Sequence, residues 1–422
     1  MFTIPHLRAQ TTPLPTHPVL SELLRTPVRA MAWMKDGKGF VAAGEAARYD
    51  HGPDTANTRF ALASQWWTEL TTGAEIRDEL KRPGTGLVCM GSFSFSPTCP
   101  AGSTLIVPQV VVGFDGEAAW LTLIGPVDRD VFDTLTDDAR ALVDAALRPS
   151  PVDYPSHGAV RVDAVDVAAY RDKVALIQER INAGGVRKVV LVRELSLQAV
   201  SPIDERYVIE RLARAYPQCW TFAVDGLVGA TPELLAATLE REVAVTVLAG
   251  TLPRTADADP QELQASPKDA DEHRLAVESV VSELSKIARI EVGPTHVLTL
   301  PNVLHLATDI RATLDFMATP LQVAGALHPT AALGGTPRLR ALEAIAEVEG
   351  IDRDRYGAPV GWMDTRGGEW CIALRCARID GTHATAWAGG GIMADSLADN
   401  EYAETEAKFA PILGALGVAD AS

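Results

Sequence analysis

Two side chains that could exchange protons with a substrate, Lys188 and Glu233, stand beside apolar, strand-like segments. Lys188 begins the β-branched run KVVLV, where it shares a face with Val190 and Val192 if the run is a strand. A lysine in this place is often a solvated strand end, but a desolvated lysine gives up its proton more readily and can act as a general base. Glu233, in GATPELL, is either an ordinary turn carboxylate or a general acid that apolar neighbours keep protonated. The residues alone leave both alternatives open.

Four further carboxylates form two pairs at helical spacing. Asp269 and Glu272 lie three residues apart near the start of one expected helix. Glu401 and Glu404 have the same spacing on the last expected helix, so each pair lies on one side of its helix. Such pairs usually form a solvated face with i,i+4 lysine partners, as Lys408 could be for Glu404. If Glu272 and Glu404 instead meet in the fold, they could bind Mg²⁺, which takes one or two carboxylates and keeps its other positions for water and substrate oxygens.

A glycine cluster, AGGGIM at residues 388–393, follows a strand-like segment and precedes the acidic last helix. Its exposed backbone N–H groups could hold a carboxylate, although tight turns use the same residues. The sequence has no G-x-x-x-x-G-K-[ST], no G-x-G-x-x-G after a strand, no H-E-x-x-H and no G-x-S-x-G. Nucleotide binding, zinc chemistry and serine hydrolysis therefore lack their usual signatures.

The composition narrows the possible partners. Apolar residues make up 47% and charged residues 22% of the 422 residues, as in ordinary globular proteins, and no apolar run reaches the roughly 18 residues of a membrane span. The amino terminus shows no secretory-signal pattern, so we expect a cytoplasmic protein. A net charge of −17 disfavours nucleic acid or an anionic membrane as the partner, and an anionic substrate would need a local cation. The five scattered cysteines predict reduced, mostly buried thiols.

The elements that must position these residues follow from the apolar periodicity. Residues 1–20, rich in Pro and Thr, predict a poorly ordered start, and the short apolar runs from there to about residue 150 predict several strands. Residues 128–147 have helical spacing and are followed by the breaker RPSPVDYPSHG. We place the division there, with an N-terminal strand-rich part at 1–150 and a catalytic region at 151–422.

The second region predicts a strand-rich mixture of helices and strands. It lacks the regular alternation of a doubly wound sheet. An amphipathic helix at 165–184 ends at two glycines and is followed by a strand at 187–195. The remaining helices are expected at 269–290 and 400–416, and the remaining strands at 219–230, 234–250, 303–314, 357–364, 371–379 and 384–393.

Read in order, these segments resemble the chorismate-utilising enzymes, a family that includes isochorismate synthase, salicylate synthase and the subunits that aminate chorismate. The resemblance runs from about residue 155 to the end, and the first 150 residues match only loosely, through CMGSFSFSP. It implies an α/β (α+β) fold: one large domain of two layered, mainly antiparallel sheets flanked by helices, with the site in a cleft between them. The motifs are RKVVLVREL, GATPELL, LAGTLPRT, SPKDADEHRLAVESVV, NVLHLATDI, ALHPTAALGGTPR, YGAPVGWMD, CIALRCARI, AGGGIM and EYAETEAK.

The resemblance implies roles for the two proton-transfer candidates and for the pocket wall. Lys188 matches the lysine that activates water for attack at ring carbon 2, and Glu233 matches the acid that protonates the hydroxyl leaving from carbon 4. This chemistry requires a neutral lysine and a protonated glutamate, so burial must favour both neutral forms. Further matches line the site or hold substrate carboxylates: Gly250, Thr251, His305, Tyr356, Arg375, Gly389, Gly391 and Lys408.

The resemblance also implies a magnesium site. Glu272 and Glu404 match the Mg²⁺ ligands, and Asp269 and Glu401 support them from behind. Magnesium on the ring carboxylate would supply the positive charge that the acidic chain otherwise lacks. The sequence departs from the common pattern at Asp269, often Glu, and at residues 397–400, where a proline is usual; both departures concern the support of the ligands.

The subtype depends on fewer residues. ALHPTAALGG resembles the form found in isochorismate synthases and places Ala332 where pyruvate-eliminating relatives commonly carry threonine, while Lys188 argues against amination by ammonia. We therefore expect a reversible, Mg²⁺-dependent isochorismate synthase that acts on chorismate as a monomer and serves menaquinone or siderophore synthesis. A salicylate synthase and a non-catalytic chorismate-binding homologue are the alternatives.

Overall fold

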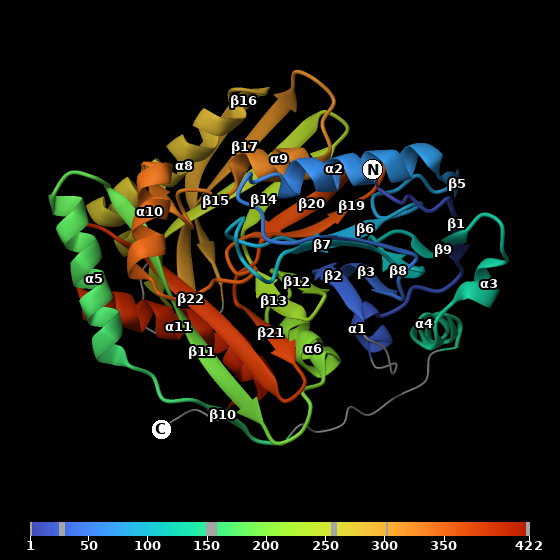
Figure 1. The fold of residues 1–422 in the computed structure, drawn as a ribbon, viewed down its shortest axis with the longest axis horizontal. Helices are drawn as coiled ribbons and strands as arrows, with labels where there is room; N and C mark the ends of the chain where they lie inside the picture. The colour runs from blue at the N-terminus through green and yellow to red at the C-terminus, as the bar shows by residue number, and fades with distance from the viewer. Residues whose placement is uncertain (1, 25–29, 149–157, 255–259, 301–302, 419–422) are drawn as a thin grey trace.

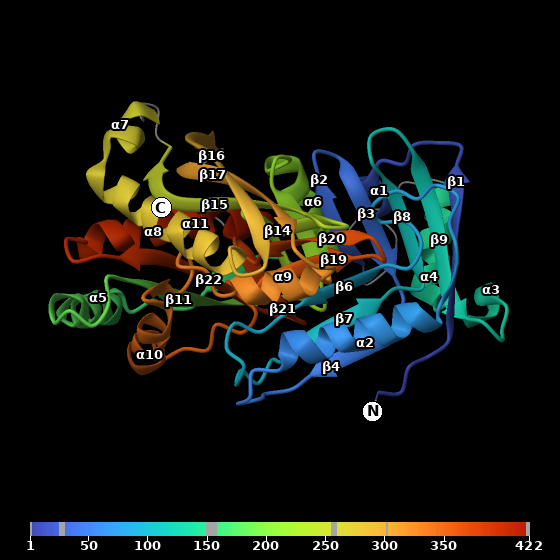
Figure 2. The same cartoon turned by 90° about the horizontal axis from the view of Figure 1, so that it is seen from above.

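Two large β-sheets pack face to face, and helices cover their outer faces (Figures 1 and 2). The structure is a computed structural model that describes residues 2–24, 30–148, 158–254, 260–300 and 303–418. Aromatic side chains join the two layers. The Trp33 Nε1–H of the larger sheet donates to Glu369 Oε2 of the smaller sheet at 2.7 Å, and the Phe40 and Trp362 rings meet edge to face. The expected fold of two layered, mainly antiparallel sheets is confirmed.

Within the described residues the larger sheet has thirteen strands and the smaller has nine. The larger sheet runs in the order β10 (Val160–Val162), β11 (Lys188–Ala199), β22 (His383–Ile392), β21 (Cys376–Asp380), β13 (Leu227–Thr231), β12 (Trp220–Val224), β2 (Met31–Lys35), β3 (Lys38–Ala43), β8 (Val110–Phe114), β9 (Ala119–Pro126), β1 (Leu7–Leu14) and β5 (Glu75–Arg77), with β18 (Gly335–Thr336) also paired to β11. The smaller sheet runs β16 (Ala288–Thr299), β17 (Val303–Leu314), β15 (Glu242–Pro253), β14 (Leu234–Leu239), β20 (Gly367–Ile372), β19 (Pro359–Met363), β6 (Cys89–Ser92), β7 (Ser103–Val107) and β4 (Ala47–His51).

Helices cover the sheets in groups. The outer face of the larger sheet packs on α1, α4, α6 and α11, its β11 edge packs on α5 and α10, and the smaller sheet packs on α2, α8 and α9. The described helices are α1 (Leu20–Leu23), α2 (Arg59–Gly73), α3 (Val131–Thr134), α4 (Asp137–Leu147), α5 (Val167–Asn182), α6 (Glu205–Ala215), α7 (Pro260–Ala265), α8 (Pro267–Leu284), α9 (Pro320–Leu327), α10 (Arg338–Val348) and α11 (Ala398–Leu416). None of them is long and apolar enough to cross a membrane.

The expectation of a poorly ordered start was wrong. Strand β1 pairs along its whole length with β9, and three of its residues also pair with β5. Its side chains alternate, with Leu7, Ala9 and Thr11 buried, and Thr11 Oγ1 lies 2.8 Å from Thr122 Oγ1 of β9. Pairing in the sheet outweighs the local Pro and Thr composition.

Two expected helices have different ends. The segment at 128–147 forms two helices, because Thr136 caps a new helix by accepting from the Ala139 N–H. The helix expected at 269–290 ends at Leu284, and its last residues enter β16 beside β17. The helix at 165–184 and strand at 187–195 are confirmed as α5 and β11.

Strands from the two halves of the chain share both sheets. In the larger sheet β2 pairs with β12, and in the smaller sheet β6 pairs with β19. Residues 149–157, which make up most of the expected boundary, lie outside the described residues. The five cysteines are free and buried, as expected.

Candidate active site

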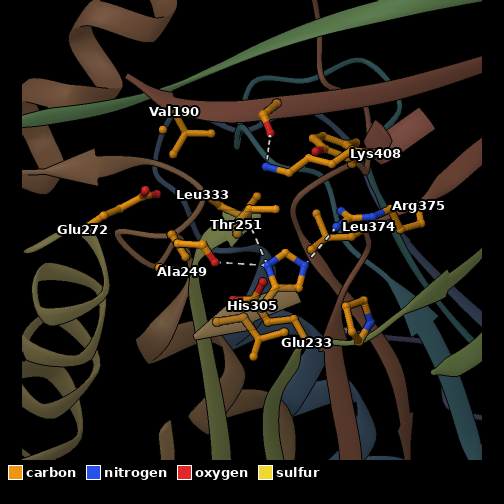
Figure 3. Close-up of a pocket in the computed structure, with 17 residues that line it drawn as sticks. Val190, Glu233, Ala249, Thr251, Glu272, His305, Leu333, Leu374, Arg375 and Lys408 are labelled. Carbon is orange, nitrogen blue, oxygen red and sulfur yellow. Dashed lines mark hydrogen bonds between the residues drawn. The ribbon is translucent and has the colours of Figure 1, made fainter. Parts of the chain in front are cut away.

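A pocket between the two sheets gathers most of the side chains singled out from the sequence (Figure 3). Residues from β11, β15, β17 and β22 meet there with those from α8 and α11. The predicted residues that line it are Glu233, Gly250, Thr251, Glu272, His305, Ala332, Tyr356, Arg375, Gly389, Gly391 and Lys408. The other predicted residues, Lys188, Asp269, Glu401 and Glu404, are not among the lining residues.

Lys188 is fully buried and reaches the site through its neighbours. Its Nζ lies 2.8 Å from Glu272 Oε1, close enough for an ion pair, but the approach is poorly aligned and makes no regular hydrogen bond. A side chain on Gly391 would collide with the Lys188 stem and with Glu272 Oε1. The glycine on β22 therefore leaves room for the charged pair, and the solvated alternative for Lys188 is excluded.

Glu233 lies where β13 passes into β14 and is only 6% exposed. Backbone contacts fix this junction: Ile372 N–H donates to Glu233 O at 3.0 Å, and Glu233 N–H donates to Thr231 Oγ1 at 3.3 Å. Burial raises the pKa of the Glu233 carboxyl to about 8, against the opposing effect of Arg375 and other cations. The carboxyl is thus protonated at neutral pH and can serve as an acid.

His305 joins two other pocket residues. Its Nδ1 lies 3.1 Å from Thr251 Oγ1, and its Nε2 lies 3.3 Å from Arg375 Nη2. A guanidinium only donates, so Nε2 must accept and the proton must sit on Nδ1. Burial, with Arg375 and Lys408 nearby, holds the pKa of His305 well below its usual value. The imidazole is therefore neutral and donates toward Thr251, which leaves the hydroxyl proton of Thr251 for another acceptor.

The backbone is shaped to present two of these residues. Gly250 has φ +77° at a register shift of β15, and a side chain there would press on Asp269 at 3.1 Å. Arg375 also has a left-handed φ of +48°, which is uncommon for a residue other than glycine and costs energy. The bulge and the turn aim the Thr251 hydroxyl and the Arg375 guanidinium toward the pocket (Figure 3).

Three carboxylates gather around the glycine cluster of β22. A side chain on Gly390 would meet Glu401 Oε2 at 3.0 Å and Glu404 Oε1 at 3.8 Å, while Gly391 faces Glu272. Burial raises the pKa of Glu404, and the nearby Glu401 and Glu272 charges raise it further. Burial alone would raise the pKa of Glu272 as well, but the Lys188 ammonium outweighs it and the net shift is downward.

Lysines balance this negative charge. Lys408 Nζ lies 2.5 Å from Glu404 Oε1 and also donates to Gly389 O at 2.8 Å. Lys268 pairs with Glu401 at 2.9 Å, so this lysine bridges α8 and α11. Ser396 Oγ also donates to Glu401 Oε1 at 2.7 Å. The close approach of these carboxylates is suited to a divalent ion. Among the described residues no group of three or more His, Cys, Asp or Glu side chains is placed so that it could hold a metal ion.

Several pocket residues were not predicted from the sequence. All are apolar or small, and most directly flank a predicted residue in the chain, which is the signal that could have found them. Val190 also follows Lys188 on the same face of β11. The unpredicted lining residues are Val190, Pro232, Leu248, Ala249, Leu333 and Leu374.

The fold and the site define a class of enzyme that binds chorismate. The family model described as chorismate binding enzyme matches residues 6–417, and the chain belongs to this family. The MenF sequence of Mycobacterium tuberculosis (strain H37Rv) is 36% identical over 85% of this chain and 96% of its own length. The salicylate biosynthesis isochorismate synthase of Pseudomonas aeruginosa is 32% identical over 91% of this chain and 84% of its own length. The structure of MenF, the menaquinone-specific isochorismate synthase from Escherichia coli, shares the fold with a TM-score of 0.79 at 24% identity, covering 98% of this chain and 95% of that one.

Proposed function

We propose that the protein is an isochorismate synthase, which adds water at ring carbon 2 of chorismate, releases the carbon 4 hydroxyl and leaves the enolpyruvyl group in place. The observation that carries the proposal is the buried Glu233 carboxyl, whose pKa is about 8 and which lines the same pocket as Glu272, the partner of Lys188. A carboxyl of this kind can protonate a leaving hydroxyl at neutral pH. Relatives that carry this name support the same reaction.

Lys188 and Glu233 would divide the proton transfers. Lys188 acts as the neutral amine, after the proton of its ion pair with Glu272 has passed to solvent. It then takes a proton from water as the water oxygen bonds to carbon 2 and the ring double bonds shift. Glu233 gives its proton to the hydroxyl on carbon 4, which departs as water, so substrate and product have the same composition. In the reverse direction the two roles exchange, as microscopic reversibility requires.

The pocket also offers anchors for the two carboxylates of chorismate. Arg375 is buried beside His305 and can form a bidentate clamp on one carboxylate. Lys408 also lines the pocket, where its Nζ donates to Gly389 O (Figure 3). Because His305 is neutral, it adds no competing charge and can hold Arg375 in place.

We propose Mg²⁺ as the cofactor, held by Glu272 and Glu404, with Asp269 and Glu401 behind them. The crowded carboxylates at Gly390 support this assignment, since their oxygen atoms suit a hard divalent cation. When bound, Mg²⁺ would neutralise the ring carboxylate and compete for the Glu272 charge that pairs with Lys188.

The pocket wall favours this activity over its nearest alternative, salicylate synthesis with pyruvate elimination. Ala332 lines the pocket and offers only a methyl group, whereas threonine would add a hydroxyl to the pocket wall. A protein that only binds chorismate would not need a carboxyl with a raised pKa, as Glu233 has, or a buried lysine such as Lys188. The names of the relatives include both menaquinone and salicylate pathways, and either can use isochorismate.

We also propose a cytoplasmic monomer. All the residues assigned to the site come from one chain, so no second copy is needed to complete it. The five buried free cysteines suit a reducing compartment. Size-exclusion chromatography with light scattering tests the monomer directly.

Labelled water tests the direction of attack. In oxygen-18 water, attack at carbon 2 predicts isochorismate with one solvent oxygen on carbon 2. Mass spectrometry of product formed in a short incubation reads the label. An unlabelled product would show that the hydroxyl migrates within the substrate, and the proposed roles of Lys188 and Glu233 would be wrong.

A further inference from the structure

A second buried ion pair, Glu349 with Arg353, lies outside the pocket and contacts two segments that line it. Both side chains are only 2% exposed. Arg353 Nε lies 2.6 Å from Glu349 Oε1, and Arg353 Nη2 lies 2.6 Å from Glu349 Oε2. This bidentate arrangement leaves neither charge facing solvent, and both side chains have donors or acceptors to spare for other groups.

Those remaining groups bind the backbone on both sides of the pocket wall. Arg353 Nη2 donates to Val190 O at 2.8 Å, and Arg353 Nη1 donates to Leu333 O at 2.8 Å. Glu349 Oε2 accepts from the Val192 N–H at 2.9 Å. Val190 and Leu333 both line the pocket, so the pair ties together the strand that carries Lys188 and the segment that carries Ala332.

The ion pair acts in place of a neighbouring strand. The two residues of β18 pair with Lys188 and Val189. Beyond this pairing, the Arg187 N–H donates to Thr336 O at 2.7 Å and the Val190 N–H donates to Gly334 O at 3.0 Å. The next groups on this edge of β11 are Val190 O and the Val192 N–H, which Arg353 and Glu349 satisfy. The two side chains thus continue the row of backbone hydrogen bonds that begins beside Lys188. The arginine donates to a carbonyl, and the glutamate accepts from an N–H.

Further contacts hold the pair itself. The Arg353 guanidinium lies 4.3 Å from the centre of the Phe95 ring, and Lys173 Nζ donates to Glu349 O at 2.7 Å. A buried ion pair gives little net stability compared with apolar residues of the same size. The Glu349–Arg353 pair binds three backbone groups in the two segments that line the pocket, which points to a role in holding these segments in position.

We propose that Glu349 and Arg353 are positioning residues that fix the spacing between Lys188 on β11 and the Ala332–Leu333 wall. This inference rests on the proposed function, since these two features would carry the water attack and the retention of the enolpyruvyl group. A shift of about 1 Å between reacting groups can lower a rate roughly a hundredfold. Loosening the pair should lower kcat strongly, change KM little and raise the share of pyruvate among the products.

Three variants test the role of the pair. Arg353→Lys keeps the charge but cannot hold Glu349, Val190 O and Leu333 O together, and Glu349→Gln keeps an acceptor for Val192 without the charge. The double variant Glu349→Arg with Arg353→Glu keeps an ion pair but reverses its polarity. The new arginine then faces the Val192 N–H, and the new glutamate faces the carbonyls of Val190 and Leu333, so these hydrogen bonds cannot form. We expect roughly a hundredfold loss of kcat for the double variant and intermediate losses for the single ones, with KM within about threefold.

Two control variants separate positioning from general damage. Arg340→Lys changes an exposed arginine that pairs with Glu343 on α10. Arg355→Lys changes a buried arginine that pairs with Asp225 and is not among the residues that line the pocket. Both should keep the wild-type kcat, and all variants are compared at temperatures where they are fully folded.

Turnover of chorismate and hydrogen exchange of peptides covering residues 188–194 and 330–336 are measured together. Faster exchange in both segments with the expected loss of kcat supports the proposal. Wild-type kcat in the folded double variant, or equal losses in Arg355→Lys, would overturn it. If the wild-type protein does not convert chorismate, the proposed function is wrong, and hydrogen exchange alone tests the positioning role. Loss of protection in both segments of the double variant supports that role, and unchanged protection overturns it.

Discussion

Lys188 Nζ lies 2.8 Å from Glu272 Oε1, and the lysine that forms this pair is completely buried. The two residues were assigned different tasks, base and metal ligand, yet the fold makes each the counter-charge of the other. Neither can be changed without leaving a charge inside the protein. In the proposed mechanism, proton transfer by Lys188 and metal binding by Glu272 are therefore coupled.

Replacing Lys188 by Met should abolish turnover while chorismate still binds. Loss of a general base typically lowers the rate by about 10²- to 10⁴-fold. The unpaired Glu272 should also destabilise the fold by about 3 kcal/mol, and the double variant Lys188→Met with Glu272→Gln should recover much of that loss. Steady-state kinetics, calorimetric titration with chorismate and urea unfolding measure the three effects. Lys286→Met, at an exposed site, is the control; retained turnover in Lys188→Met would remove the base assignment.

The forward reaction should slow as the pH rises through about 8, because Glu233 then loses the proton that it must donate. Glu233→Gln should lower kcat by about 10²- to 10⁴-fold, since the amide cannot act as an acid. A profile of kcat from pH 6 to 10 in wild type, with Glu240→Gln as an exposed control, checks this. A flat profile across pH 8 in an enzyme limited by chemistry would contradict the assignment.

Stability gives an independent test of the same carboxyl. Its pKa is raised from 4.5 to about 8 on folding, so its contribution to stability is complete below pH 4.5 and is lost as the pH rises to about 8. Glu233→Gln removes this ionisation. As the pH rises from 5 to 8, the unfolding temperature of wild type should therefore fall relative to that of the variant. No change in that difference would place Glu233 in a solvated environment.

Glu272→Gln and Glu404→Gln should weaken Mg²⁺ binding. Loss of one carboxylate from a site with few protein ligands should raise the Mg²⁺ concentration for half-maximal turnover at least tenfold, which is about 1.4 kcal/mol. The rise in unfolding temperature that Mg²⁺ causes in wild type should shrink in both variants. Glu278→Gln, an exposed position on α8, serves as the control. Unchanged Mg²⁺ dependence in both variants would show that the metal binds elsewhere.

Ala332→Thr should shift the products toward salicylate and pyruvate. The added hydroxyl would lie in the pocket wall next to Leu333, whose carbonyl Arg353 holds. Chromatography and a coupled pyruvate assay give the ratio of products. Ala332→Val, which has nearly the same shape without the hydroxyl, separates steric from polar effects. An identical product ratio in Ala332→Thr and wild type would remove Ala332 as the determinant of subtype.

Most of the pocket wall could be predicted because each residue belongs to a short motif whose order along the chain is specific to the family. Helical spacing also predicts the Glu404–Lys408 pair, which the structure has. The charged pairs that join different elements could not be predicted. Spacing on one helix predicts Lys268 as a neighbour of Glu272, but the fold places it 2.9 Å from Glu401 of α11. The role of the Glu349–Arg353 pair could not be predicted, because it depends on the backbone groups at the edge of β11 that no described strand binds, and the sequence does not show them.

The same limit explains the errors in the fold. Strand β1 looks irregular by composition, and only its pairing with β9 makes it a strand. The end of the helix at 269–290 is apolar at helical spacing, yet residues from Ala288 onward pair with β17. Local periodicity located the buried strands and long helices, whereas edge strands and helix ends depend on tertiary partners.

The most direct test of the proposed function is to incubate the pure protein with chorismate and Mg²⁺, with EDTA in a parallel sample, and to resolve the products by chromatography while assaying pyruvate. We predict isochorismate without pyruvate, lost in EDTA and restored by added Mg²⁺. Salicylate with an equal amount of pyruvate, or no conversion of chorismate by the folded protein, would contradict it.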